Sequence, residues 1–195
     1  MRRTTIALIV AALATMAAVG ATVAVAATIT GTDNDDQLFG TRGSDQIQAL
    51  AGNDAVLAFR GNDFVDAGDG NDFVLGNRGA DLLRGRNGDD IVRGGRGNDH
   101  VFAGVGVDTT FGGPGDDVMF ALALADAATP GGDTLFGGRG HDVIHVNDGE
   151  ADTVDCGRDR DIAIVDLGDL DNVSHCEVVI QRAPNPQEDQ QETGV

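Results

Sequence analysis

The stretch that decides the fold spans residues 85–102 and reads GRNGDDIVR followed by GGRGNDHVF, two nonapeptides in tandem. Each has Gly at its fourth position, Asp at its sixth and Val at its eighth. Working outward, the Asp recurs every nine residues, ten times in succession: Asp36, Asp45, Asp54, Asp63, Asp72, Asp81, Asp90, Asp99, Asp108 and Asp117. So short and strict a period indicates a repeat architecture, in which units stack on one another to bury a shared core.

Each nonapeptide provides one turn, one carboxylate and one residue for the core. The fourth position is Gly in nine of the ten repeats and Asn34 in the first. Because Gly and Asn tolerate positive φ, we expect one left-handed backbone position per repeat. The eighth position is apolar in nine repeats, and the exception, Thr110, makes the ion site of Asp108 the least favourable.

Nine residues are too few for a helix and a strand together. Tripeptides such as residues 73–75 (FVL) have strand propensity, and the six residues before them are turn formers. Two units would therefore form one coil, with two short strands back to back and loops at opposite edges. The sequence predicts an all-β protein, a parallel β-roll (β-solenoid) of nonapeptide repeats with two repeats per coil and a coil spacing of about 4.8 Å.

The two quoted nonapeptides resemble the consensus G-G-x-G-x-D-x-U-x of RTX, or hemolysin-type, calcium-binding repeats, and the resemblance extends over about residues 31–163. It implies a right-handed roll that holds Ca²⁺ between successive loops on each edge, through the consensus Asp and backbone carbonyls of the glycine-rich turns. The metal ligands predicted in this way are Asp36, Asp45, Asp54, Asp63, Asp72, Asp81, Asp90, Asp99, Asp108, Asp117, Asp133 and Asp142.

The residue types agree with a metal-binding role. Of the 32 acidic residues, 28 are Asp, which is typical of turns, and only four are Glu, which favours helices. Asp residues two repeats apart, such as Asp54, Asp72 and Asp90, would place like charges on adjacent coils, where a cation is needed. Oxygen ligands and flexible loops favour Ca²⁺ over Mg²⁺. The alternative is a metal-free solenoid in which these Asp residues merely cap turns.

The N-terminal segment is typical of export. Arg2 and Arg3 precede an uncharged apolar stretch over residues 6–25, which ends in the A-x-A pattern of residues 24–26. We predict a secretory signal peptide over residues 1–27, an extracellular location and no membrane insertion after cleavage. An uncleaved membrane anchor is the alternative, because the stretch is long enough to span a bilayer.

The rest of the chain divides into three predicted zones. Residues 28–120 form the calcium-binding β-roll of ten contiguous nonapeptides, residues 121–182 an interrupted roll with a disulfide-linked cap, and residues 183–195 a disordered tail. The interruption, residues 121–127 (ALALADA), suits a short helix or an apolar flap. Asp133 and Asp142 then resume the period in a shifted frame.

The repeat pattern degenerates after Asp142. Asp152 comes one residue late, and Asp161 has only Ala163 in the core position, so we expect an atypical terminal unit that caps the solenoid. Cys156 and Cys176 are the only cysteines. In an exported protein such a pair is expected to form a disulfide, with free thiols or metal ligands as the alternatives.

Charge and composition exclude several functions. The formal net charge is −19 and all 13 basic residues are Arg, which disfavours nucleic acids and anionic membranes as partners. Neither Ser44 nor Ser174 lies in a G-x-S-x-G motif, the four histidines form no H-E-x-x-H motif, and Lys, Tyr and Trp are absent. We therefore expect a protein without enzyme activity.

The sequence favours a secreted, non-enzymatic calcium-binding protein whose roll folds on binding Ca²⁺. The alternative is an adhesive or enzyme-associated module that binds a polysaccharide or a partner protein at the cell surface. Phe102 and Phe120 lie two repeats apart and would stack on adjacent coils. Exposed rings would favour the alternative, whereas a cover formed by residues 121–127 would give them a structural role.

Overall fold

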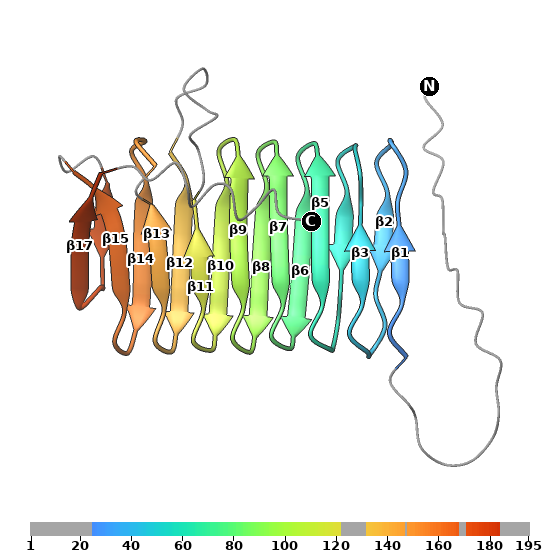
Figure 1. The fold of residues 1–195 in the computed structure, drawn as a ribbon, viewed down its shortest axis with the longest axis horizontal. Coiled ribbons are helices and arrows are strands. Elements are labelled where there is room, and N and C mark those ends of the chain that lie inside the picture. The colour runs from blue at the N-terminus through green and yellow to red at the C-terminus, as the bar shows by residue number, and fades with distance from the viewer. Residues whose placement is uncertain (1–24, 122–131, 147, 168–170, 184–195) are drawn as a thin grey trace, which may run out of the picture.

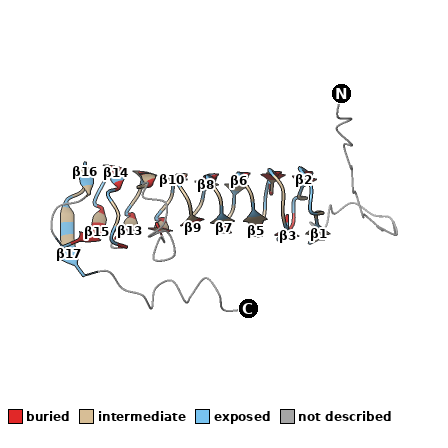
Figure 2. Cartoon of the chain, turned by 90° about the horizontal axis from the view of Figure 1, so that it is seen from above, coloured by how far each residue is buried: buried red, intermediate tan, exposed pale blue. Residues whose placement is uncertain are grey.

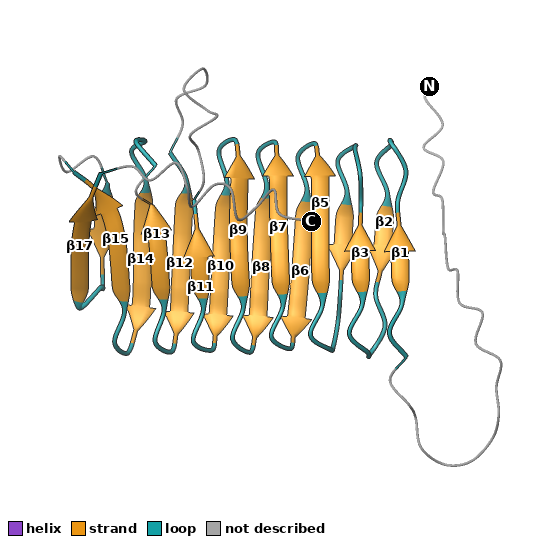
Figure 3. Cartoon of the chain, viewed as in Figure 1, coloured by secondary structure: helices purple, strands orange, loops and turns teal. Residues whose placement is uncertain are grey.

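The computed structural model describes residues 25–121, 132–146, 148–167 and 171–183. Three sequence predictions therefore lie outside the described residues: the signal peptide up to residue 24, the helix or flap over residues 122–127, and the tail over residues 184–195. Every regular element in the described part is a β-strand (Figure 3). Within that part, no helix has the length and hydropathy needed to cross a bilayer.

The chain winds into two parallel sheets that face each other, as Figure 1 shows from the side and Figure 2 from above. One sheet contains β1 (Thr28–Thr30), β3 (Gln46–Gln48), β5 (Phe64–Asp69), β7 (Leu82–Asn87), β9 (His100–Val105), β11 (Val118–Phe120), β13 (Val143–Val146), β15 (Ile162–Asp166) and β17 (Val178–Arg182). The other contains β2 (Gln37–Phe39), β4 (Ala55–Leu57), β6 (Phe73–Arg78), β8 (Ile91–Arg96), β10 (Thr109–Pro114), β12 (Thr134–Arg139), β14 (Thr153–Arg158) and β16 (Asn172–Ser174). The chain passes from one sheet to the other after each nonapeptide, so the predicted β-roll with two repeats per coil is confirmed.

The core is a narrow seam between the two sheets. Strands β2 to β15 each place their second residue there, and successive coils align these residues, as in Ile47, Val65 and Leu83. These side chains are fully buried. Thr110 occupies the same position in β10, and its buried hydroxyl has no hydrogen-bond partner in the described structure. The repeat thus tolerates a residue of valine's shape even where its polar atom is unsatisfied.

The strands are longer than the predicted tripeptides in the middle of the roll. Strand β5, for example, continues through Ala67 and Gly68 to Asp69, residues that the sequence assigned to a turn. These residues stay in register with the next coil, where Gly68 pairs with Arg86 and Asp69 with Asn87. The prediction was wrong because turn propensity is local, whereas the stacked neighbour extends the parallel pairing into the first half of the loop.

From the third repeat to the tenth, the turns have two left-handed positions rather than the one predicted, whereas the prediction was wrong for Asn34 and Gly43 in the first two repeats, which do not have positive φ. The expected position is present, as at Gly79 with φ 141°. A second lies two residues earlier, where Asn77 has φ 75° and the equivalent Gly95 has φ 118°. Leu50, Phe59 and Arg86 adopt the same conformation at a steric cost. The glycine at the second position of the consensus is therefore explained by backbone geometry.

The interruption leaves the register intact. Strand β10 pairs with β12 across it, and β11 pairs with β13, so that Thr110 stands opposite Leu135 and Met119 opposite Ile144. Beyond it, Cys156 in β14 and Cys176 are joined by a disulfide. This confirms the predicted pairing and ties the last coil to the one before it.

Gly79→Ala tests the close packing of the loops. A Cβ on Gly79 would overlap the carbonyl oxygen of Gly61 in the preceding coil, at a positive φ that an L-residue rarely adopts. We expect the free energy of unfolding, measured by urea denaturation in calcium, to fall by about 2 kcal/mol or more. The exposed neighbouring variant Ala80→Ser should change it by less than about 0.5 kcal/mol. Equal stabilities for the two variants would contradict the packing described.

Candidate metal centre

The repeated Asp residues form two columns, one along each edge of the roll. In each column the backbone N–H of one Asp donates to the Oδ1 atom of the Asp in the next coil, as from Asp72 to Asp90 at 2.7 Å and from Asp81 to Asp99 at 2.9 Å. The upper column precedes the strands of the eight-stranded sheet and consists of Asp36, Asp54, Asp72, Asp90, Asp108, Asp133 and Asp152. The lower column precedes the strands of the nine-stranded sheet and consists of Asp45, Asp63, Asp81, Asp99, Asp117, Asp142 and Asp161. All twelve predicted ligand residues lie in these columns, and none is more than 6% exposed.

The columns extend two residues further than predicted. Asp152 and Asp161 continue them because one residue is added between Asp142 and Asp152. Paired Asp residues are therefore 19 residues apart there in place of 18. The columns end where Asp171 accepts from the N–H of Asp152 and Glu177 from that of Asp161. The signal was present in the sequence, since Asp152 is followed two residues later by the buried Val154.

In eleven of the fourteen column carboxylates, the second oxygen has no donor in the part of the chain that the structure describes. While Oδ1 accepts a backbone hydrogen bond, the buried Oδ2 atom has no hydrogen-bond partner within the described residues for Asp54, Asp63, Asp72, Asp81, Asp90, Asp99, Asp117, Asp133, Asp142, Asp152 and Asp161. Buried polar groups are normally satisfied, and a buried charge without a partner is strongly unfavourable. The columns therefore require either protons or cations.

The first coil differs from the others. The Oδ2 atom of Asp36 accepts hydrogen bonds from the N–H and the hydroxyl of Thr32, at 2.6 and 2.8 Å. Thr41 also donates twice to Asp45, from its N–H to Oδ2 and from its hydroxyl to Oδ1. Because threonine donates to these two carboxylates, we expect Asp36 and Asp45 to bind a cation less readily than the predicted ligands whose Oδ2 atom has no donor within the described residues.

In several loops, the space beside the orphaned oxygen suits a hard cation. A Cβ added to Gly76 would meet both the Oδ2 atom of Asp81 and the carbonyl oxygen of Gly94 in the next coil. Gly112 has the same surroundings, formed by Asp117 and the carbonyl of Gly137. Within the described ranges, no group of three or more His, Cys, Asp or Glu side chains could hold a metal by itself. One carboxylate per loop, completed by carbonyls, is an oxygen donor set that fits Ca²⁺.

Not every repeat leaves that space open. The first position of the loop is Gly before Asp81, Asp90, Asp99, Asp117 and Asp142. It is Ala before Asp54, Asp63, Asp72 and Asp108. Loops with Gly at this position and an orphaned Oδ2 atom therefore fit a cation best.

Burial changes the acidity of the columns. It raises the pKa of the column aspartates from Asp54 to Asp99 and from Asp117 to Asp161 above 3.8, and repulsion between neighbours in the column raises it further at several positions, while the backbone hydrogen bonds oppose the rise. The pKa is about 6 for Asp54, Asp63, Asp72, Asp81 and Asp117, about 7 for Asp99 and Asp142, about 8 for Asp90 and Asp152, and about 9 for Asp133. Near neutral pH, the metal-free columns are thus poised between protonated and charged forms.

A second ladder, which sequence reasoning missed, runs through the fifth position of the loops. The side-chain oxygen of Asn53 accepts from the N–H of Asn71, and that of Asn71 accepts from the N–H of Asp89. On the lower edge, Asn62 accepts from Ala80 in the same manner. The signal was the frequent Asn immediately before the consensus Asp. This ladder holds the loops at a fixed spacing around each candidate site.

The chain belongs to the family of RTX calcium-binding nonapeptide repeats. The model of that family matches four stretches, residues 30–65, 60–83, 84–119 and 128–163, which together cover more than half of the chain. No curated protein matches the chain in sequence. The repeats of this family bind calcium, and the orphaned carboxylate oxygens lie in the same repeats that the family model covers.

The raised pKa values predict an unusual pH dependence without metal. A carboxyl group whose folded-state pKa exceeds its unfolded value contributes stability that is fully present below the unfolded pKa, near 3.8, and is lost as pH rises through the folded values of about 6 to 9. We therefore expect the calcium-free protein to retain β-structure and a urea unfolding transition at pH 5, and to have lost most of that structure at pH 8 even without urea, as measured by far-UV circular dichroism. In saturating calcium the order should reverse, because protons compete with the metal. Greater stability at pH 8 in the absence of calcium would contradict the burial of these carboxylates.

Proposed function

We propose that this chain is a secreted, non-enzymatic calcium-binding protein whose β-roll folds when Ca²⁺ binds between its stacked loops. The single observation that carries the proposal is the repeated Oδ2 atom without a donor, buried in both columns. A purely structural role for these Asp residues would need only the Oδ1 atom, which already accepts the backbone hydrogen bond. The second oxygen is thus left for a cation.

In each loop, different atoms would orient the carboxylate and hold the ion. In the loop of Asp90, the Oδ1 atom stays bonded to the N–H of Asp72 and so fixes the carboxylate. The Oδ2 atom and the carbonyl of Ala103 in the next coil both border the space beside Gly85. A calcium ion held by these groups would supply positive charge beside the carboxylate, and its ligands would come from two adjacent coils. Binding to one loop should therefore favour order in its neighbours, so that metal uptake is cooperative.

Electrostatics supports coupling between binding and folding. At the coil spacing of about 4.8 Å, two unit charges at an effective dielectric of about 20 repel each other by roughly 3 kcal/mol. Each repeat opposes this repulsion with one large core side chain, such as Val74 or Val92, to which several repeats add only a buried alanine, such as Ala67. Burial in so narrow a core stabilises the fold too little to offset the repulsion along a column of like charges. We therefore expect the ionised, metal-free chain to be unfolded.

Export fits this chemistry. Extracellular calcium modules bind at about 10⁻⁴ to 10⁻³ M, so that the chain would stay unfolded in a calcium-poor cytoplasm and fold outside. The disulfide between Cys156 and Cys176 suits an oxidising compartment. The apolar segment over residues 6–25 supplies the export signal in this proposal.

The aromatic pair offers little support for the alternative, adhesive function. Phe102 and Phe120 do stack, with ring centroids 4.9 Å apart, but Phe102 is only 6% exposed. Arg84 lies over the Phe102 ring, and His145 stacks on Phe120. These rings belong to a packed outer layer of one sheet, so a ligand-binding surface has to be sought elsewhere.

Calcium stoichiometry tests the proposal with two adjacent residues. Asp90→Asn keeps an oxygen for the N–H of Asp72 but removes the charge facing the site, whereas Asp89→Asn removes the same charge from an exposed side chain that bonds the N–H of Val107. By titration calorimetry we expect Asp90→Asn to bind one or two fewer ions than the unaltered protein and Asp89→Asn to bind the same number. Identical stoichiometries for both variants would refute the assignment.

A further inference from the structure

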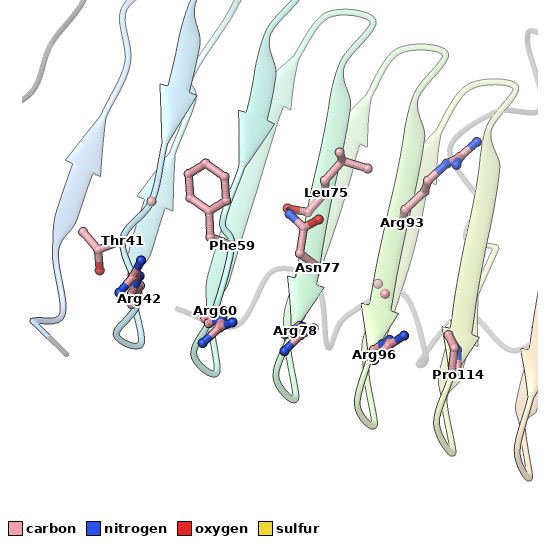
Figure 4. Close-up of a pocket in the computed structure, with 13 residues that line it drawn as sticks. Thr41, Arg42, Phe59, Arg60, Leu75, Asn77, Arg78, Arg93, Arg96 and Pro114 are labelled. Atoms are coloured by element: carbon pink, nitrogen blue, oxygen red, sulfur yellow. The ribbon is translucent and has the colours of Figure 1, made fainter. Parts of the chain in front are cut away.

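Arginines line the lower edge of the roll in a single row. They stand at the third position of the lower loops, in register from coil to coil: Arg42, Arg60, Arg78, Arg96, Arg139 and Arg158, with Pro114 in the one gap. Figure 4 shows the first four side by side along the lower edge, where Arg78 and Arg96 are the last residues of β6 and β8. All six are exposed, and none forms an ion pair with an acidic side chain in the part of the chain that the structure describes.

The nonapeptide repeat does not require this row. On the upper edge, the third position of the loop is occupied by Asp33, Ala51, Asp69, Asn87 and Val105. The arginines therefore follow an 18-residue period superimposed on the nine-residue one. Nearly half of the 13 basic residues of a chain with net charge −19 are gathered on one edge. Neither calcium binding nor the core accounts for that asymmetry.

A groove runs beside the first four arginines, with a cavity volume of 1020 Å³. Its walls also include Phe59 and Leu75. Phe59 is 40% exposed and has φ 77°, a conformation for which most later repeats use glycine. It lies 6.5 Å from the ring of Phe39, which is also exposed. An exposed aromatic residue in a costly backbone conformation indicates a surface that is kept for a ligand.

We propose that the lower edge binds a linear acidic polysaccharide, with its carboxylates on the arginine row and the C–H faces of its sugar rings against Phe59 and Leu75. A guanidinium group binds a carboxylate through two parallel hydrogen bonds. The row repeats at the coil spacing of about 4.8 Å, so it suits a stiff polymer with one carboxylate per sugar. A single-stranded nucleic acid fits less well, because base stacking needs aromatic side chains along the whole site, and here they occur at one end.

The inference rests on the proposed function, because the arginines form a straight row only in the folded roll. Calcium in the two columns also offsets the buried negative charge that would otherwise repel an anionic polymer. The polysaccharide site itself lies on the outer surface of the loops and uses no residue of either column. The two ideas can therefore be tested separately.

The test uses an end-labelled oligogalacturonate of about ten sugars and fluorescence anisotropy in calcium-containing buffer. Arg78→Gln combined with Arg96→Gln should weaken binding by about tenfold or more. The control combines Arg160→Gln with Arg182→Gln, which removes the same charge outside the row and should weaken binding less than threefold. Equal losses in the two double variants would overturn the proposal, since general charge or calcium bridging would then explain binding.

A gain-of-function variant and ligand controls complete the test. Pro114→Arg fills the gap in the row and should strengthen binding of a longer oligogalacturonate by at least about threefold. The methyl-esterified oligomer should not bind. Polyglutamate or oligothymidylate binding as tightly as oligogalacturonate, or no gain with Pro114→Arg, would contradict the assignment to an acidic polysaccharide. Calcium stoichiometry measured on the same variants should be unchanged, so that failure of the calcium proposal is recognised independently.

Discussion

The structure depends on one constraint: every coil buries two carboxylates, and the coils are so close that each carboxylate lies against its equivalent in the next coil. The Oδ1 atoms turn this proximity into a continuous hydrogen-bonded column, as between Asp72 and Asp90. The buried Oδ2 atoms that have no donor within the described residues need positive charge beside them. A proton or a hard cation can satisfy that demand, and the raised pKa values show that protons already compete near neutral pH.

The backbone of the loops follows from the same constraint. Carbonyl groups can border each orphaned oxygen only if the turn passes close to its neighbour, which requires two left-handed positions per repeat, as at Asn77 and Gly79. The side-chain ladder through Asn53 and Asn71 keeps the loops at that separation. The site therefore requires a glycine-rich loop. Because most residues of each repeat lie in the loop, few remain for the core, and the core is narrow.

The sequence predicted the features that repeat every nine residues, because a strict period converts spacing directly into register. The columns through Asp54 and Asp63 and the buried seam through Val65 follow from it. It could not predict that strands extend to residues such as Asp69, since that depends on pairing with the next coil. It also missed Asp152, which a one-residue lengthening displaced, and the arginine row, whose 18-residue period is visible only once the two edges are separated.

Far-UV circular dichroism of the protein at pH 7.5 tests the central claim most directly, namely that cations in the carboxylate columns decide folding. The spectrum is recorded in chelator, after addition of millimolar Ca²⁺, and with Mg²⁺ as the control for ionic charge alone. The account predicts a disordered spectrum in chelator, a β-rich one in calcium and little change with magnesium, because the loops offer carbonyl-rich sites without octahedral geometry. A β-rich spectrum already present in chelator and unchanged by calcium would contradict it.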